Sequence, residues 1–350
     1  MRCKKGKRQV LELDSRSDRK IQQVSKSLSE ASLGMRIYLI ISVLALAIFA
    51  AMPFIIGVDS FFIYYLFMVF IYIVVSQGWN LIGGYTGQIS LSTHAFFALG
   101  GYTTALIWIH NVTHTWYYFD PLVMFLSGVV PAIFAIVIGL PTLSRLRGDY
   151  FSFGTLAAAS ILQIIILRTT EFSGGAVGLR LPGGAFTDLG RYYWTALLLV
   201  VLAIVAMYAI TKSRIGLALR AISEDEVSAA SHGIHILRYK LVSFMISSFM
   251  VGVCGSLFAY YQFMVNPDTL MSLDRWMFYP ILICVLGGNG TIIGPIIGSF
   301  VVVTLFTFGE NLVGRVHPML SGILILLVMK YLPTGLWGLK DKIRFSRTTS

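Results

Sequence analysis

Long apolar segments alternate with short polar stretches from residue 37 to near the end of this chain. Since about 20 helical residues cross the hydrocarbon of a bilayer, each long apolar segment is a candidate membrane span. The candidates are 37–58, 61–82, 89–109, 122–141, 150–168, 192–211, 239–263, 276–287, 291–309 and 317–332. This alternation predicts an all-α fold, a polytopic membrane helix bundle of about ten transmembrane helices.

Glycine-rich stretches interrupt two of the expected spans. The first runs from Gly83 to His94 and the second from Gly287 to Thr291. Interrupted helices in both halves of a membrane protein are the best sequence indicator of a transport path, whereas tight helix packing is the alternative for each glycine. The expected substrate-pathway residues are Gly83, Gly84, Gln88, Ser90, Ser92, His94, Gly287, Gly288 and Thr291. For the polar side chains among them, hydrogen bonding between helices is the competing role.

A polar island from Lys212 to Lys240 separates two of the apolar segments. Within it, Ser223 and Glu226 have the spacing of a capping box, which satisfies free N–H groups at the start of a helix. Gly233 is suited to ending that helix, because glycine adopts a left-handed conformation at little cost. These signals predict a short capped helix over about residues 223–232, held between two membrane spans.

Composition and charge support a membrane protein and orient it. Hydrophobic residues make up 56% of the chain and charged residues 12%, against about 25% charged residues in soluble domains. The net charge of +11 arises from basic residues that flank the spans, which argues against a nucleic-acid-binding surface. With ten spans, most of the 27 Lys and Arg residues fall on one side, in 1–36, 212–240 and after 330. Both termini and the polar island are therefore predicted to be cytoplasmic.

The patterns that catalysis, nucleotide binding or metal binding would require do not occur. No stretch has the form G-x-x-x-x-G-K-[S/T], so we do not expect this chain to bind ATP. The cysteines Cys3, Cys254 and Cys284 lack the spacing of zinc ligands or of a disulfide framework. His110 and His114 have an i, i+4 spacing without a cluster of carboxylates beside them. We expect no enzymatic activity, no metal site and no cofactor.

Five stretches of the chain resemble one known family. They read GWNLIGGYTGQISLSTHAFFALGGYTTALI (78–107), RGDYFSFGTLAAASILQIII (147–166), SGGAVGL (173–179), GLALRAISEDEVSAASHGIHILRYKLVSF (216–244) and VLGGNGTIIGPIIG (285–298). In this order they resemble the permease subunits of branched-chain amino acid ABC importers. The resemblance implies about ten helices and pairing with a second permease subunit as a heterodimer. It also implies two cytoplasmic ATP-binding subunits and an extracytoplasmic solute-binding protein as partners, with membrane lipid around the bundle.

Within this family the polar island is similar to the coupling helix, here about residues 220–233, which docks on an ATP-binding subunit. The positions carried over as coupling residues are Arg220, Glu224, Asp225, Glu226, Ala230 and Gly233. The expected organisation is a basic cytoplasmic tail (1–36), a transmembrane permease domain (37–335) and a second basic tail (336–350). The basic tail before residue 36 is not part of the resemblance.

The sequence supports two hypotheses for the function. The first is the permease subunit of an ATP-driven importer, which moves branched-chain amino acids or related small polar solutes across the bacterial cytoplasmic (inner) membrane by alternating access. The alternative is a secondary transporter driven by an ion gradient, which would need buried carboxylates at the interrupted helices. Asp and Glu are absent from both glycine-rich stretches, so the first hypothesis is favoured.

Overall fold

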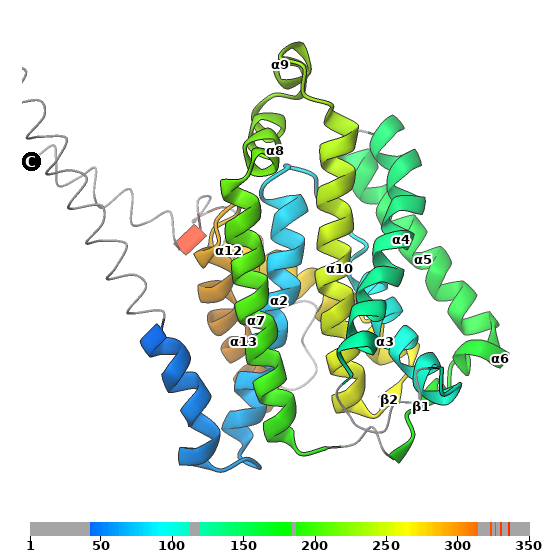
Figure 1. Ribbon diagram of the computed structural model, residues 1–350, viewed down its shortest axis with the longest axis vertical. Coiled ribbons are helices and arrows are strands. Elements are labelled where there is room, and N and C mark those ends of the chain that lie inside the picture. Colours follow the sequence, from blue (N-terminus) through cyan, green and yellow to red (C-terminus); the bar gives the residue numbers. More distant parts are fainter. Residues whose placement is uncertain are drawn as a thin grey trace, which may run out of the picture. The chain divides into compact units, whose positions relative to one another are not determined.

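The computed structural model describes residues 43–112, 120–146, 148–183 and 187–313, together with isolated positions between 323 and 336 (Figure 1). The expected span at 317–332 and the two basic tails fall, apart from those positions, outside this described part. Val43–Ile56 is a short apolar helix, and all of it except its last residue belongs to a first compact unit, which ends at Ile55. The helices that follow belong to a second compact unit, which is described by itself below.

The second unit is built almost entirely from helices. They are α2 (Phe61–Gly83), α3 (Thr93–Ile109), α4 (Pro121–Arg145), α5 (Asp149–Arg168), α6 (Thr170–Ser173), α7 (Leu189–Lys212), α8 (Arg214–Glu224), α9 (Glu226–Ser231), α10 (Ile236–Gln262), α11 (Pro267–Leu270), the π-helical turn η2 (Asp274–Phe278), α12 (Tyr279–Gly287) and α13 (Ile293–Val313). The two-residue strands β1 (Leu179–Arg180) and β2 (Met264–Val265) pair antiparallel, with Leu179 opposite Val265.

Six stretches of the described residues are long and apolar enough to cross a membrane. They are Phe61–Gly83, Pro121–Arg145, Asp149–Arg168, Leu189–Lys212, Ile236–Gln262 and Pro267–Gly287. The last of these begins upstream of the expected span at 276–287, because α11 and η2 precede α12. The predicted all-α fold is confirmed, with six candidate membrane spans among the described residues, while the total of about ten spans stays a prediction.

The core of the second unit is α2, which is apolar on every face and is buried along most of its length. A helix that is hydrophobic all round is expected in the interior of a bundle. It contacts α7, α10, α12 and α13, and Figure 1 shows it among these helices. Since α2 ends at the first glycine-rich stretch, its packing fixes where that stretch lies.

Small residues let α3 and α10 approach each other at backbone distance. A Cβ added to Gly100 would lie 2.0 Å from the carbonyl oxygen of Gly252, and one added to Gly255 would lie 2.0 Å from that of Phe97. Because association in lipid depends on close van der Waals packing, such contacts are typical of membrane helices. The close contact with α10 fixes the position of α3, which directly follows the first glycine-rich stretch.

Candidate functional site

The two glycine-rich stretches meet beside the last turn of α2. The amide of Asn80 donates to the carbonyl of Thr291 over 2.8 Å and accepts from the backbone N–H of Gly290 over 2.9 Å. One turn earlier, Gln77 Nε2 donates to the carbonyl of Ile292 over 2.6 Å. Two side chains of α2 therefore satisfy backbone groups in the turn between α12 and α13, as membrane interiors require.

The nine expected pathway residues are mostly enclosed by the protein. Gly84 and Thr291 are half-buried, and the following are buried: Gly83, Gln88, Ser90, Ser92, His94, Gly287 and Gly288. The hydroxyls of Ser90 and Ser92 lie 2.9 Å apart, and Trp79 Nε1 donates to the carbonyl of Ser90 over 2.9 Å. These contacts fit the competing role of hydrogen bonding between segments, and the pathway role stays a prediction.

His94 differs from the serines that precede it. Its side chain is 1% exposed, and neither ring nitrogen has a hydrogen-bond partner within the described part of the chain. Buried polar atoms normally find a partner in the protein or in ordered water. Among the described residues, His94 is therefore a pathway candidate with both ring nitrogens unused, and Oε1 of Gln88 is unused as well.

Residues 84–92, here called the connector, join α2 to α3 and are fastened to α5. Ser152 Oγ donates to the carbonyl of Ile89 over 2.6 Å, and Thr155 Oγ1 accepts from the backbone N–H of Leu91 over 3.0 Å. The sequence analysis expected a span from residue 89, but the helix begins only at Thr93. Hydroxyls of α5 replace the helical hydrogen bonds that the connector lacks.

The polar island forms two short helices instead of the single capped helix that the sequence analysis expected. Asp225 caps α9 by accepting from the backbone N–H groups of Val227 (2.8 Å) and Ser228 (3.2 Å). Ser223 lies inside α8 and donates to the carbonyl of Arg220 over 2.8 Å. The capping-box prediction at Ser223 was therefore wrong, because α8 continues through it to Glu224.

The expected stop at Gly233 is confirmed. Its φ of +82° lies in the left-handed region that glycine tolerates. The N–H of Gly233 donates to the carbonyl of Ala230 over 3.0 Å. The N–H of Ile234 donates to the carbonyl of Ala229 over 3.1 Å. These bonds close the carbonyl end of α9 before α10 begins.

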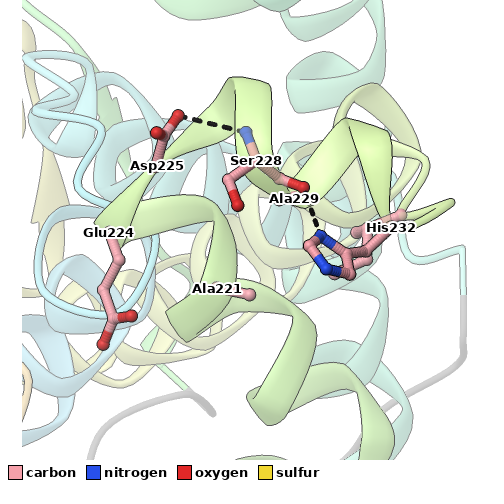
Figure 2. Close-up of a pocket in the computed structure, with 7 residues that line it drawn as sticks. Ala221, Glu224, Asp225, Ser228, Ala229 and His232 are labelled. Atoms are coloured by element: carbon pink, nitrogen blue, oxygen red, sulfur yellow. Dashed lines mark hydrogen bonds between the residues drawn. The ribbon is translucent and has the colours of Figure 1, made fainter.

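A groove lies between α8 and α9 (Figure 2). Its lining residues are Ala221, Glu224, Asp225, Ser228, Ala229, His232 and Ile234. Five of the six expected coupling residues are exposed and accessible to a soluble partner: Arg220, Glu224, Asp225, Ala230 and Gly233. His232 Nδ1 lies 2.8 Å from the carbonyl of Ser228, which fixes the ring at the end of α9.

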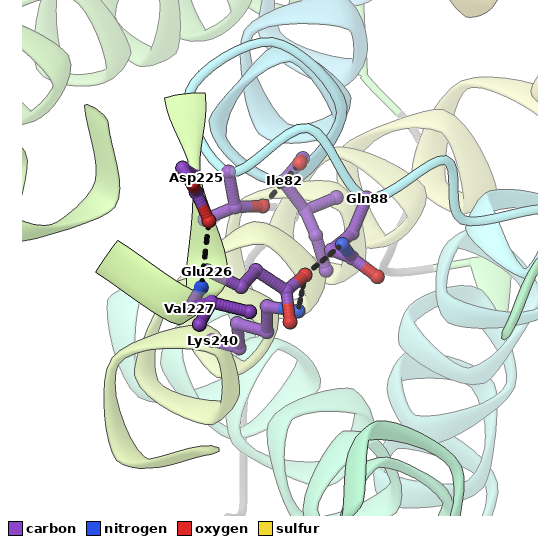
Figure 3. Close-up of polar contacts among 7 residues, drawn as sticks. Ile82, Gln88, Asp225, Glu226, Val227 and Lys240 are labelled. Atoms are coloured by element: carbon purple, nitrogen blue, oxygen red, sulfur yellow. Dashed lines mark hydrogen bonds and ion pairs between the residues drawn. The ribbon is translucent and has the colours of Figure 1, made fainter. Parts of the chain in front are cut away.

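Glu226 and the exposed Arg220 also contact the connector. Glu226 Oε1 lies 3.2 Å from Gln88 Nε2 of the connector, and the guanidinium of Arg220 lies 5.6 Å from the centre of the Tyr85 ring. Both contacts join the α8–α9 pair to the connector. The same carboxylate oxygen of Glu226 lies 2.5 Å from Lys240 Nζ at the start of α10 (Figure 3).

Lys240 is buried and forms an ion pair, a role that the sequence did not predict. From the sequence it is one of the basic residues that flank a span. A usable signal was its place inside an apolar helix downstream of an acidic cluster, since a cation there needs an anionic partner.

Within the described ranges, no group of His, Cys, Asp and Glu residues is arranged to hold a metal ion. Cys254 and Cys284 are buried free thiols, and both donate to backbone carbonyls of α2. His114 and Cys3 lie outside the described residues.

Comparison with known proteins identifies the family. A model of the family described as "Branched-chain amino acid transport system / permease component" matches residues 61–329. The chain belongs to this family. It is accordingly a multi-pass membrane protein, the permease component of a branched-chain amino acid ABC transport system, and not a catalytic enzyme. The resemblance found in the sequence is confirmed.

Individual relatives agree with this assignment. The high-affinity branched-chain amino acid transport system permease protein LivM of Salmonella typhimurium is 30% identical, over 77% of this chain and 68% of its own. The probable permease LivM of Methanocaldococcus jannaschii is 25% identical, over 69% of this chain and 77% of its own. LivH of Salmonella typhimurium is 30% identical over 44% of this chain and 49% of its own. No solved structure matches the chain significantly.

The contacts of Asn80 generate a prediction about stability. Replacing Asn80 by Ala removes both bonds to the second glycine-rich turn and leaves half-buried backbone groups unpaired, which should lower the free energy of unfolding by about 1–3 kcal/mol. Asn289→Ala, in the same turn, alters an exposed amide and should change the free energy of unfolding by less than about 0.5 kcal/mol. Unfolding in mixed detergent micelles, followed by tryptophan fluorescence, measures both. Equal losses in the two variants would contradict the assigned role of Asn80.

Proposed function

We propose that this permease is the transmembrane subunit of an ATP-driven importer in the cytoplasmic (inner) membrane. It moves branched-chain amino acids or related small polar solutes by alternating access. Its partners are a second permease subunit, two cytoplasmic ATP-binding subunits and an extracytoplasmic solute-binding protein. The names of the relatives support this assembly, since LivM and LivH are both permease proteins of branched-chain amino acid systems.

In this proposal the α8–α9 pair is the coupling element and lies in the cytoplasm together with both termini. Residues 37–335 form the permease domain of about ten spans, flanked by basic tails at 1–36 and 336–350. The observation that carries the proposal is the fastening of the α8–α9 pair to the connector at one interrupted span, through Glu226 and Arg220. The exposed carboxylates Glu224 and Asp225, with Ala230, provide a surface for an ATP-binding subunit.

The substrate pathway is proposed to pass the junction of the two glycine-rich stretches. Its residues are Gly83, Gly84, Gln88, Ser90, Ser92, His94, Gly287, Gly288 and Thr291. Support comes from the meeting of the stretches at Asn80 and from the unused hydrogen-bonding capacity of His94. Neutral polar groups can bind a zwitterion transiently without holding it.

Reconstitution separates the two candidate energy sources. Proteoliposomes holding both permease subunits and the ATP-binding subunits, with binding protein on the extracytoplasmic side, should accumulate radiolabelled leucine when ATP is supplied to the ATP-binding subunits. Without ATP, a proton or sodium gradient should drive no accumulation. Uptake driven by the gradient in vesicles that lack the ATP-binding subunits would contradict the proposal and favour a secondary transporter.

The left-handed turn at Gly233 generates a graded prediction. A Cβ at Gly233 meets nothing within 4 Å, so the cost of substitution arises from the backbone conformation alone. Uptake should be highest in Gly233→Asn, lower in Gly233→Ala and lowest in Gly233→Pro, because Asn tolerates positive φ and proline is locked near −65°. Uptake by the reconstituted complex, normalised to the amount of protein in the membrane, measures the order. Full uptake by Gly233→Pro would show that the turn after α9 is not part of the coupling element.

A further inference from the structure

A buried ion pair lies where α9 meets α10. Lys240 Nζ is 2.5 Å from Glu226 Oε1, and the side chains of Lys240 and Glu226 are 4% and 31% exposed. Burying an ammonium group is unfavourable unless an anion and hydrogen bonds compensate it. Glu226 provides that anion from the first residue of α9.

The same carboxylate oxygen also accepts from the connector. Gln88 Nε2 lies 3.2 Å from Glu226 Oε1, as Figure 3 shows together with the ion pair. We call Gln88, Glu226 and Lys240 the clasp. One oxygen atom thus joins three segments: the connector, α9 and α10. Bonds to charged groups are shorter and more directional than apolar contacts, so the clasp fixes the position of α9 relative to both neighbours.

We propose that the clasp transmits the movement of α9 to the interrupted span, and this inference rests on the proposed function. Asp225 caps α9 on two backbone N–H groups, so α9 and Glu226 move as one piece. Displacement of α9 by an ATP-binding subunit then moves Gln88 and, with it, the connector. Lys240 is a positioning residue, which keeps the Glu226 carboxylate directed at Gln88.

The tight turns around the connector support this role. Gly84 has no space for a side chain, since a Cβ there would lie 2.5 Å from the backbone nitrogen of Gly290. A displacement at Gln88 therefore reaches the second glycine-rich stretch without passing through flexible side chains. The connector is also bound to α5 through Ser152 and Thr155, so the same displacement acts on a third element.

Single substitutions test the clasp in the reconstituted complex. Glu226→Lys and Lys240→Met should each lower the amount of leucine taken up per ATP hydrolysed by about tenfold, within the range of measured coupling free energies. The ATP-binding subunits should still assemble and hydrolyse ATP, because Glu224, Asp225 and Ala230, the exposed residues proposed to face them, are unchanged. Lys240→Arg preserves the charge and should retain most of the coupling. Lys212→Met removes an exposed lysine at the end of α7 and serves as the matched control with normal uptake.

The exchanged pair gives the sharper test. Glu226→Lys combined with Lys240→Glu restores opposite charges, and Gln88 can accept from a lysine through Oε1, which has no partner among the described residues. Uptake per ATP should therefore recover to within about threefold of the unaltered complex, since a double-mutant cycle isolates the pair interaction. A merely structural role would instead show as loss of assembly.

Three results would overturn the inference. The first is normal uptake by both single variants. The second is loss of coupling in the single variants without recovery in the exchanged pair. The third is failure to assemble with the ATP-binding subunits, in the single variants and in the exchanged pair alike. A bifunctional thiol reagent joining Gln88→Cys to Glu226→Cys gives an independent reading: the linked protein should still transport, because the two residues move together. Blocked transport that returns on cleavage of the link would also overturn it. Lack of ATP-dependent uptake by the unaltered complex would refute the proposed function instead.

Discussion

Backbone N–H and C=O groups that a broken membrane helix leaves free must be satisfied inside the protein, since lipid offers no partner. In this permease the break after α2 meets that requirement with side chains of its neighbours. Asn80 serves the turn between α12 and α13, while Ser152 and Thr155 of α5 serve the connector. The two interruptions therefore form one junction. Each helix that donates to or accepts from its backbone groups is also held in position by those hydrogen bonds.

This junction explains why the polar island matters to the membrane part of the protein. The α8–α9 pair does more than link two spans, because Glu226 and the exposed Arg220 contact the connector while Glu224 and Asp225 are exposed to solvent. One face of the pair is available to a soluble subunit and the other holds the interrupted span. Such an arrangement can transmit a displacement over a short distance with few intervening side chains.

The sequence predicted the features that depend on local composition. Apolar length located the helices, and the cost of a left-handed turn located the stop at Gly233. It failed where tertiary packing decides. Ser223 and Asp225 can both cap a helix, but burial of Leu219 and Ile222 extends α8 past Ser223, so Asp225 takes the role. The contacts of Gln88 with Glu226, and of Asn80 with Gly290, join segments whose proximity no local pattern encodes.

Distance measurement between spin labels tests the central claim, that α9 and the connector move as one body. Val227 on α9 and Ile89 in the connector have exposed side chains suited to labelling, and Trp194 on α7 provides a reference. On addition of ATP and loaded binding protein to the complete transporter, the Val227–Ile89 distance should stay constant while the distances from both to Trp194 change together. A shift of Val227 relative to Ile89, with the Ile89–Trp194 distance unchanged, would contradict the account.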